Sequence, residues 1–210
     1  MLEAVLNTGA ADAPLAAVLA HPYPPAGGSL HNKVVYHAMK AFSALGLPAV
    51  RFNFRGVGRS AGAFDQGVGE QDDATAVIDW AHENLALPLI FVGFSFGSYV
   101  GLRATCTDPR VVGRIGLGLP VRAHYRDYTY EFLPQCPGPL LFISGDTDEF
   151  SPVPALERVL ATVTAHHRSI IIPGADHFFA GTPDSPAPKL GLMQTGIQQW
   201  LRAEFAASNS

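Results

Sequence analysis

The segment from Gly93 to Gly97 places a serine, Ser95, between two glycines in a G-x-S-x-G pattern. It follows an apolar run at residues 89–92 and precedes an apolar stretch at residues 98–105, which predicts a strand, a tight turn and a helix. A nucleophile on such a turn needs glycine neighbours, because a Cβ there would strike the adjacent backbone. The turn would also place the Phe96 amide at a helix N-terminus, where it can donate to an oxyanion. The alternative interpretation is a glycine-rich turn with an incidental serine.

A serine hydroxyl is a weak acid, so its attack on an ester at neutral pH needs a base and a group that orients this base. His177 follows the apolar run 169–172, and Asp148 follows the apolar run 140–144. Each lies just beyond the end of an expected parallel strand, at the edge where open α/β sheets assemble their sites. We therefore expect Ser95, Asp148 and His177 to act as nucleophile, acid and base.

Other residues compete for two of these roles. Asp146 is the alternative acid, but we expect it to cap its turn by accepting backbone amides. Asp176 is a poor candidate because it is adjacent to His177, and neighbouring side chains diverge. His166 and His167 are expected to close a helix and to interact with its C-terminal dipole, where they would not act as the base.

A second oxyanion donor is expected in the loop that follows the apolar run 15–20. This loop begins His21-Pro22-Tyr23-Pro24-Pro25, and its prolines stiffen the chain while Tyr23 keeps a backbone amide between them. The Tyr23 N–H is therefore our candidate. His21 is a possible acid or base, but we favour a role in holding the loop through side-chain hydrogen bonds.

The elements that must position these residues can be read from apolar periodicity. Short runs rich in Val, Ile, Leu and Phe alternate with segments whose apolar residues recur at three and four, which predicts an α/β fold with a mostly parallel central sheet and helices on both faces. The expected strands cover residues 2–6, 15–20, 49–54, 89–92, 115–119, 140–144 and 169–172. The expected helices cover residues 32–45, 71–85, 98–105, 152–165 and 190–205.

Composition limits the class of protein. The chain has 210 residues, 48% of them hydrophobic and 15% charged, which predicts one well-cored domain over residues 1–210. The formal net charge is −4 and no long basic run is present, so nucleic acid and membrane surfaces are poor partner candidates. The histidines and acids show no metal-ligand spacing, and we expect catalysis without metal or cofactor. The oligomeric state is left open.

Three features favour a cytoplasmic location. The apolar run near the N-terminus lacks the positively charged segment of a signal peptide, and no stretch reaches the roughly eighteen apolar residues of a membrane span. Cys106 and Cys136 are not in a CxxC spacing, so a thiol-reducing compartment is the simpler interpretation, with Cys106 as a small core residue.

A further glycine-rich segment, residues 56–61, matches the G-x-G-x-x-A dinucleotide pattern and follows an expected strand. That motif must open a helix, whereas the following residues 62–69 hold three glycines and no helical periodicity. We therefore expect a loop here, braced by carboxylate pairs of Arg55 and Arg59.

The motifs around Ser95, Asp148 and His177 together resemble the α/β-hydrolase superfamily, over nearly the whole chain. Residues 21–35 and 51–60 resemble a branch of small bacterial hydrolases described as dienelactone-hydrolase-like or prolyl-oligopeptidase-like. The resemblance implies the same triad, with the Tyr23 and Phe96 amides as the oxyanion hole. Dienelactone hydrolases proper use cysteine as the nucleophile, whereas this chain has serine.

The resemblance also indicates that this chain has little room for a cap over the site. Larger relatives carry a helical lid between the strand that follows the nucleophile helix and the strand that bears the acid, but here only residues 120–139 separate these strands. A minimal cap or none is expected, with Tyr125, Tyr128 and Phe178 as possible substrate-pocket residues. Plain surface packing of the tyrosine-rich loop is the alternative.

The function expected from these residues is hydrolysis of small carboxylic esters through an acyl-enzyme. Two alternatives remain open: a catalytically idle α/β-hydrolase fold that serves as a binding module, or acyl transfer or amide hydrolysis by the same triad.

Overall fold

The computed structural model describes residues 1–123 and 126–205 and is built on a seven-stranded sheet with the order β1-β3-β2-β4-β5-β8-β9. Strand β1 at one edge pairs antiparallel with β3, and the other neighbours are parallel. This confirms the expected α/β class. The strands of the sheet are β1 (Ala4–Asn7), β2 (Ala16–Ala20), β3 (Ala49–Phe52), β4 (Leu89–Phe94), β5 (Val111–Leu117), β8 (Leu140–Gly145) and β9 (His167–Ile172).

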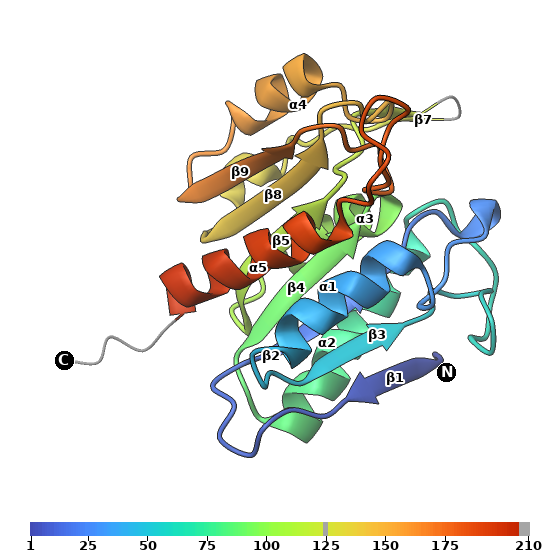
Figure 1. Ribbon diagram of the computed structural model, residues 1–210. Helices are drawn as coiled ribbons and strands as arrows, with labels where there is room; N and C mark the ends of the chain where they lie inside the picture. Colours follow the sequence, from blue (N-terminus) through green and yellow to red (C-terminus); the bar gives the residue numbers. More distant parts are fainter. Residues whose placement is uncertain (124–125, 206–210) are drawn as a thin grey trace.

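Helices cover both faces of this sheet (Figure 1). On one face α1 (Lys33–Ser43) and α5 (Leu190–Phe205) pack against each other, and their apolar residues share one buried cluster with the sheet. On the other face, α2 (Gly69–Leu85), α3 (Phe96–Thr105) and α4 (Val153–Leu160) contribute to a second buried cluster. The sheet therefore has an apolar layer on each side, as the continuous apolar runs of its parallel strands require.

Most element boundaries lie within a few residues of expectation, but one helix is shorter than predicted. Helix α4 ends at Leu160, and the following Thr162 hydroxyl donates to the Val159 carbonyl at 2.7 Å. Such side-chain bonds to the backbone compete with helix continuation. His166 and His167 consequently do not close a helix, which corrects that prediction: His167 opens β9, and His166 bonds to Glu204 of α5 at 2.9 Å.

The segment between β5 and β8 contains no long helix among its described residues. It holds a two-stranded ribbon of β6 (Arg122–Ala123) and β7 (Arg126–Asp127), and a short 3₁₀ turn η2 (Leu133–Gln135). Tyr128 is 6% exposed and packs edge-on against Tyr99 of α3, with ring centroids 4.9 Å apart. The segment is thus fastened to the helix that follows Ser95.

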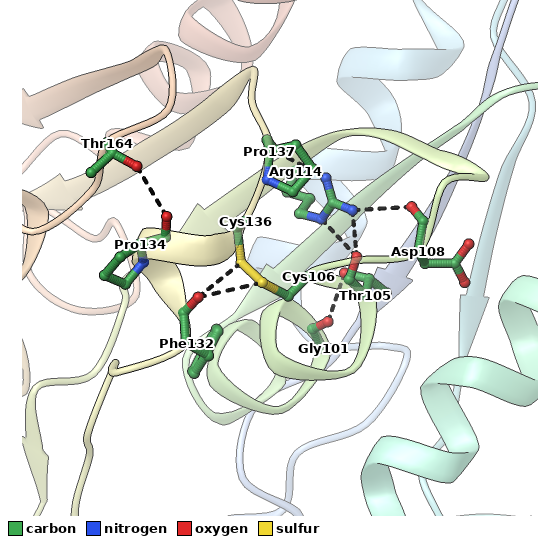
Figure 2. The surroundings of a disulfide bond; sticks show 10 residues. All are labelled: Gly101, Thr105, Cys106, Asp108, Arg114, Phe132, Pro134, Cys136, Pro137 and Thr164. Carbon is green, nitrogen blue, oxygen red and sulfur yellow. Dashed lines mark hydrogen bonds between the residues drawn. A yellow bond between two sulfur atoms is a disulfide. The ribbon is translucent and has the colours of Figure 1, made fainter.

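A disulfide joins the end of α3 to this segment, and it disagrees with the expectation of a thiol-reducing compartment (Figure 2). Cys106 directly follows α3 and Cys136 directly follows η2, and the two cysteines are 30 positions apart in sequence. No residue spacing signalled this pairing, because it depends on the packing of the tyrosine-rich segment on α3. Disulfides are typical of oxidising compartments, so the cysteines no longer support a cytoplasmic location.

A buried arginine holds the chain on both sides of the disulfide (Figure 2). The Arg114 guanidinium, from β5, donates to the Thr105 carbonyl and to the Pro137 carbonyl, the latter at 3.2 Å. Burial lowers the pKa of Arg114 to about 10, so the group is still charged at neutral pH. Carbonyl oxygens of both cross-linked segments thereby solvate one cation, which favours the geometry in which the two cysteines meet.

Loss of the disulfide should lower stability strongly. In the chain-entropy treatment, opening a loop of 30 positions costs about 3 to 4 kcal/mol of unfolding free energy, which for a chain of this size is a fall in Tm of roughly 6 to 16 °C. Differential scanning calorimetry of wild type with and without reductant measures this. The Cys106→Ala/Cys136→Ala variant is the control and should melt at the reduced temperature whether or not reductant is present. An unchanged Tm on reduction, together with two titratable thiols in the untreated protein, would contradict the cross-link.

None of the helices in the described part of the chain combines the length and apolar character needed to cross a bilayer.

Candidate active site

Ser95 lies between β4 and α3 in a backbone conformation that L-residues rarely adopt. Its φ and ψ angles are 54° and −122°, and such a residue costs on the order of 1–3 kcal/mol and is typical of functional turns. The Ser95 amide is held by the Leu117 carbonyl at 2.9 Å, and the Ser95 carbonyl accepts from the Ser98 amide at 2.8 Å. Bonds from two neighbouring elements therefore hold the turn in its strained form.

The two glycines of the motif are required by close backbone approach. A Cβ on Gly93 would collide with the Ser98 backbone, and a Cβ on Gly97 would collide with the His21 carbonyl oxygen. The second contact also shows that the start of α3 lies against the end of β2. Phe96 at the start of α3 and the loop that carries Tyr23 are consequently neighbours, and the centroids of the two aromatic rings are 5.6 Å apart.

The three residues expected to form a triad are joined by hydrogen bonds. The Ser95 hydroxyl lies 2.9 Å from His177 Nε2, and His177 Nδ1 lies 2.8 Å from Asp148 Oδ2. The second oxygen of Asp148 accepts the amides of Phe150 and Ser151 at 2.9 and 3.1 Å. Because the Asp148 carboxylate accepts from His177, the imidazole presents an unprotonated Nε2 to the serine, which is the arrangement a general base needs.

The competing acids bind backbone amides instead. Asp146 accepts the Gly174 amide at 2.8 Å, so it ties the loop after β8 to the loop after β9, whereas capping of its own turn had been expected. Asp176 accepts the amides of Phe178 and Ala180 at 2.9 and 2.8 Å. Both carboxylates therefore shape the loop that carries His177 without contacting its ring nitrogens, whose hydrogen bonds go to Ser95 and Asp148.

His21 is fully buried and holds the loop that follows β2. Its Nε2 accepts the Phe54 amide at 3.1 Å, which leaves the proton on Nδ1 to be donated to the Pro22 carbonyl at 2.7 Å. In a trans peptide the C=O and N–H point in opposite directions, so a bond that fixes the Pro22 oxygen also fixes the direction of the Tyr23 N–H. His21 is thus a positioning residue for this loop, in agreement with the structural role we favoured.

Acid should weaken the fold through His21. Burial lowers the pKa of His21 to about 4, from an ordinary value of 6.5. The unfolded chain therefore takes up this proton below about pH 6.5 while the folded chain does not, so the contribution is fully present above pH 6.5 and is lost as pH falls toward 4. Between pH 7.5 and pH 5, we expect His21 to account for a loss of about 2 kcal/mol of unfolding free energy. Denaturant unfolding of wild type and His21→Gln at both pH values isolates the contribution of His21 to this loss. An equal loss of unfolding free energy in the two proteins would contradict the prediction.

A cavity of about 140 Å³ opens directly over Ser95. Ser95, His177 and Tyr23 line it together with Phe150 and Phe178. The Phe150 and Phe178 rings flank the His177 ring, with centroids 4.6 and 5.2 Å away. Phe150 was not anticipated as a pocket residue, although its position two residues after the expected acid could have suggested it.

The three aromatic residues proposed for the pocket have different outcomes. Phe178 lines the cavity. Tyr128 does not, because its ring is buried against Tyr99. Tyr125 lies outside the described residues. The wall on the side of the tyrosine-rich segment is supplied by Pro120 and Ala123.

The described part of the chain offers no candidate metal site. No group of three or more histidine, cysteine, aspartate or glutamate side chains there is placed to hold a metal ion.

Of the two arginines expected to brace the glycine-rich loop, Arg55 pairs with Asp73 at 2.9 Å. At Arg59 the backbone amide, rather than the guanidinium, donates to the Glu3 carboxylate, at 2.8 Å.

The parallel sheet, the strained serine turn and the hydrogen-bonded Ser-His-Asp chain define the architecture of an α/β hydrolase. The protein-family model described as alpha/beta hydrolase domain matches residues 14–203 of the sequence. The chain therefore belongs to this family. Over 175 residues the chain is 37% identical to an uncharacterized protein, RP471, of Rickettsia prowazekii (strain Madrid E). This match covers 80% of this chain and 73% of that protein.

Two solved structures are similar over almost the whole chain. One is XC6422 from Xanthomonas campestris, described as an α/β serine hydrolase without a lid, with 35% identity, a TM-score of 0.83, and coverage of 99% of this chain and 91% of that one. The other is an α/β serine hydrolase homologue from Coxiella burnetii, with 32% identity, a TM-score of 0.83, and coverage of 95% and 91%. They confirm the expected lid-poor branch of the superfamily.

Proposed function

We propose that this protein hydrolyses small carboxylic esters through an acyl-enzyme on Ser95. The observation that carries the proposal is the continuous hydrogen-bonded chain from the Ser95 hydroxyl through His177 to the buried Asp148 carboxylate. A binding module would need none of these three residues in this arrangement. The family and its serine hydrolase relatives support the same reaction class.

The geometry supports a two-step mechanism. His177 Nε2 removes the proton from Ser95 Oγ as this oxygen attacks the ester carbonyl, and the Tyr23 and Phe96 amides would stabilise the resulting oxyanion. His177 then gives its proton to the leaving alcohol, which leaves an acyl group on Ser95. In the second step His177 deprotonates a water molecule, which hydrolyses the acyl-enzyme and restores the serine.

Asp148 would act on the imidazole throughout both steps. Its carboxylate keeps the proton of neutral His177 on Nδ1 and stabilises the imidazolium that forms when Nε2 takes a proton. The two backbone amides on its other oxygen hold the carboxylate in place. Acyl transfer and amide hydrolysis would use the same groups and differ in the acceptor or leaving group.

Labelling with a fluorophosphonate tests whether Ser95 is an activated nucleophile without requiring the right substrate. Intact-mass spectrometry should show one adduct on wild type, mapped to the peptide that contains Ser95, and none on Ser95→Ala. A folded wild-type protein that stays unlabelled would favour the catalytically idle binding module.

A cytoplasmic location remains a proposal, and the Cys106–Cys136 disulfide favours an oxidising compartment instead. Fractionation of the source cells, followed by thiol trapping under non-reducing conditions, decides between the two.

A further inference from the structure

The cavity over Ser95 is small, but a second cavity adjoins it. The second one measures about 560 Å³, against about 140 Å³ for the first. Gly27, Asn32 and Phe178 line both, so these residues form the boundary between an inner cavity at the serine and an outer chamber. Drug-sized ligands occupy roughly 300–1,000 Å³, a range that includes the outer chamber and excludes the inner cavity.

The two compartments differ in their relation to the catalytic groups. During ester cleavage the leaving oxygen must lie within hydrogen-bond reach of His177 Nε2, because it takes its proton there. The Phe178 ring packs edge-on against the His177 ring, with centroids 5.2 Å apart and an interplanar angle of 85°. An alcohol portion that extends past His177 therefore meets Phe178 and the outer chamber beyond it, while the acyl portion is confined to the inner cavity.

The outer chamber has both apolar and cationic walls. Pro188 and Leu190 provide apolar surface, and Ser29, His31 and Lys33 provide polar groups. Lys33 is exposed and forms no ion pair with the described residues. Among the described residues no carboxylate side chain lines the chamber, and Asp176, whose carboxylate accepts the backbone amides of the lining residues Phe178 and Ala180, is not part of its wall. The chamber is thus complementary to a negative charge, although the whole chain carries a formal net charge of −4.

We propose that the substrates are esters with a short acyl group and a larger alcohol portion that carries an anionic group, held in the outer chamber beside Lys33. This inference rests on the proposed esterase function and adds which half of the ester is large and which charge it carries.

The alcohol half can be tested with a matched pair of acetyl esters: 4-acetoxybenzoate, which carries a carboxylate on its leaving group, and 4-acetoxybenzamide, which is neutral and of similar size. The Lys33→Gln variant should lower kcat/KM for the anionic ester about three- to fivefold, through KM, because one exposed ion pair contributes that much. The neutral ester should change less than about twofold on the same grounds. Intrinsic leaving-group reactivity cancels, since each ester is compared between two enzymes.

Lys40→Gln is the matched control, because Lys40 is also exposed and lies on the same helix, in its last turn away from the chamber. It should change neither ester. For wild type, the ratio of kcat/KM for the anionic ester to kcat/KM for the neutral ester should also fall as ionic strength rises from about 0.05 to about 0.5 M. Equal effects of Lys33→Gln on both esters, or no effect on either, would overturn the proposed chamber while leaving the esterase function intact.

The acyl half has its own test in wild type, with p-nitrophenyl acetate, butyrate and octanoate. We expect kcat/KM to fall from butyrate to octanoate at least tenfold, and a preference for octanoate would overturn the assignment of the acyl group to the inner cavity. If no ester is cleaved and Ser95 takes no fluorophosphonate, the proposed function itself fails, and the inference fails with it.

Discussion

Replacement of Ser95 by alanine should lower kcat for ester hydrolysis by at least about 10³-fold, because covalent attack is lost and only binding and oxyanion stabilisation remain. The fold should survive. Alanine and serine have the same difficulty at a φ of 54°, and the bonds that hold the turn involve backbone groups. Steady-state kinetics combined with thermal unfolding measures both quantities.

Ser144→Ala is the matched control for this variant. Ser144 is a fully buried serine at the end of β8, and its hydroxyl has no hydrogen-bond partner among the described residues. Its loss should leave kcat within about twofold, since it removes no interaction. Unchanged esterase activity in a folded Ser95→Ala variant would defeat the assignment of the nucleophile.

Asp148→Asn should reduce kcat by about 10²- to 10⁴-fold with little change in KM. An asparagine oxygen can still accept the Phe150 and Ser151 amides, so the loop should keep its form. Its NH₂ group would then face His177 Nδ1 and favour the tautomer with the proton on Nε2, which cannot accept the serine proton. The expected loss is therefore one of catalysis, and the KM and the unfolding midpoint should stay close to those of wild type.

Asp146→Asn separates the acid from its neighbour. The Asp146 carboxylate holds the Gly174 amide, and asparagine can still accept that bond, so we expect kcat to fall less than about fivefold. A larger loss for Asp146→Asn than for Asp148→Asn would reverse the assignment of the acid.

Much of the fold and site could be predicted because their signals are local. Each strand that carries a site residue is an apolar run, and Ser95, Asp148 and His177 each follow such a run within a few residues. The order of parallel strands brings their carboxyl ends to one edge, so strand positions together with the motif around Ser95 indicated which side chains would meet there. The glycines at 93 and 97 were predictable for the same reason, since a strand-to-helix turn leaves no room for a Cβ.

The features that sequence reasoning missed depend on packing between distant segments. The disulfide forms because Tyr128 and Tyr130 pack on Tyr99 and bring residue 136 to the end of α3, and no periodicity encodes that contact. The interaction of Asp146 with Gly174 joins loops 28 residues apart. The outer chamber is lined from the β2–α1 loop, the start of α1 and the segment that precedes α5, so its charge could not be read from any single stretch.

The most direct test of the central claim is to trap the acyl-enzyme. Wild type mixed with excess p-nitrophenyl acetate and quenched in acid during turnover should gain the mass of one acetyl group, and peptide mapping should place that group on Ser95. The p-nitrophenol released before the steady state should equal the amount of acetylated protein. Steady hydrolysis with no covalent adduct, or with an adduct on any other residue, would contradict an acyl-enzyme at Ser95.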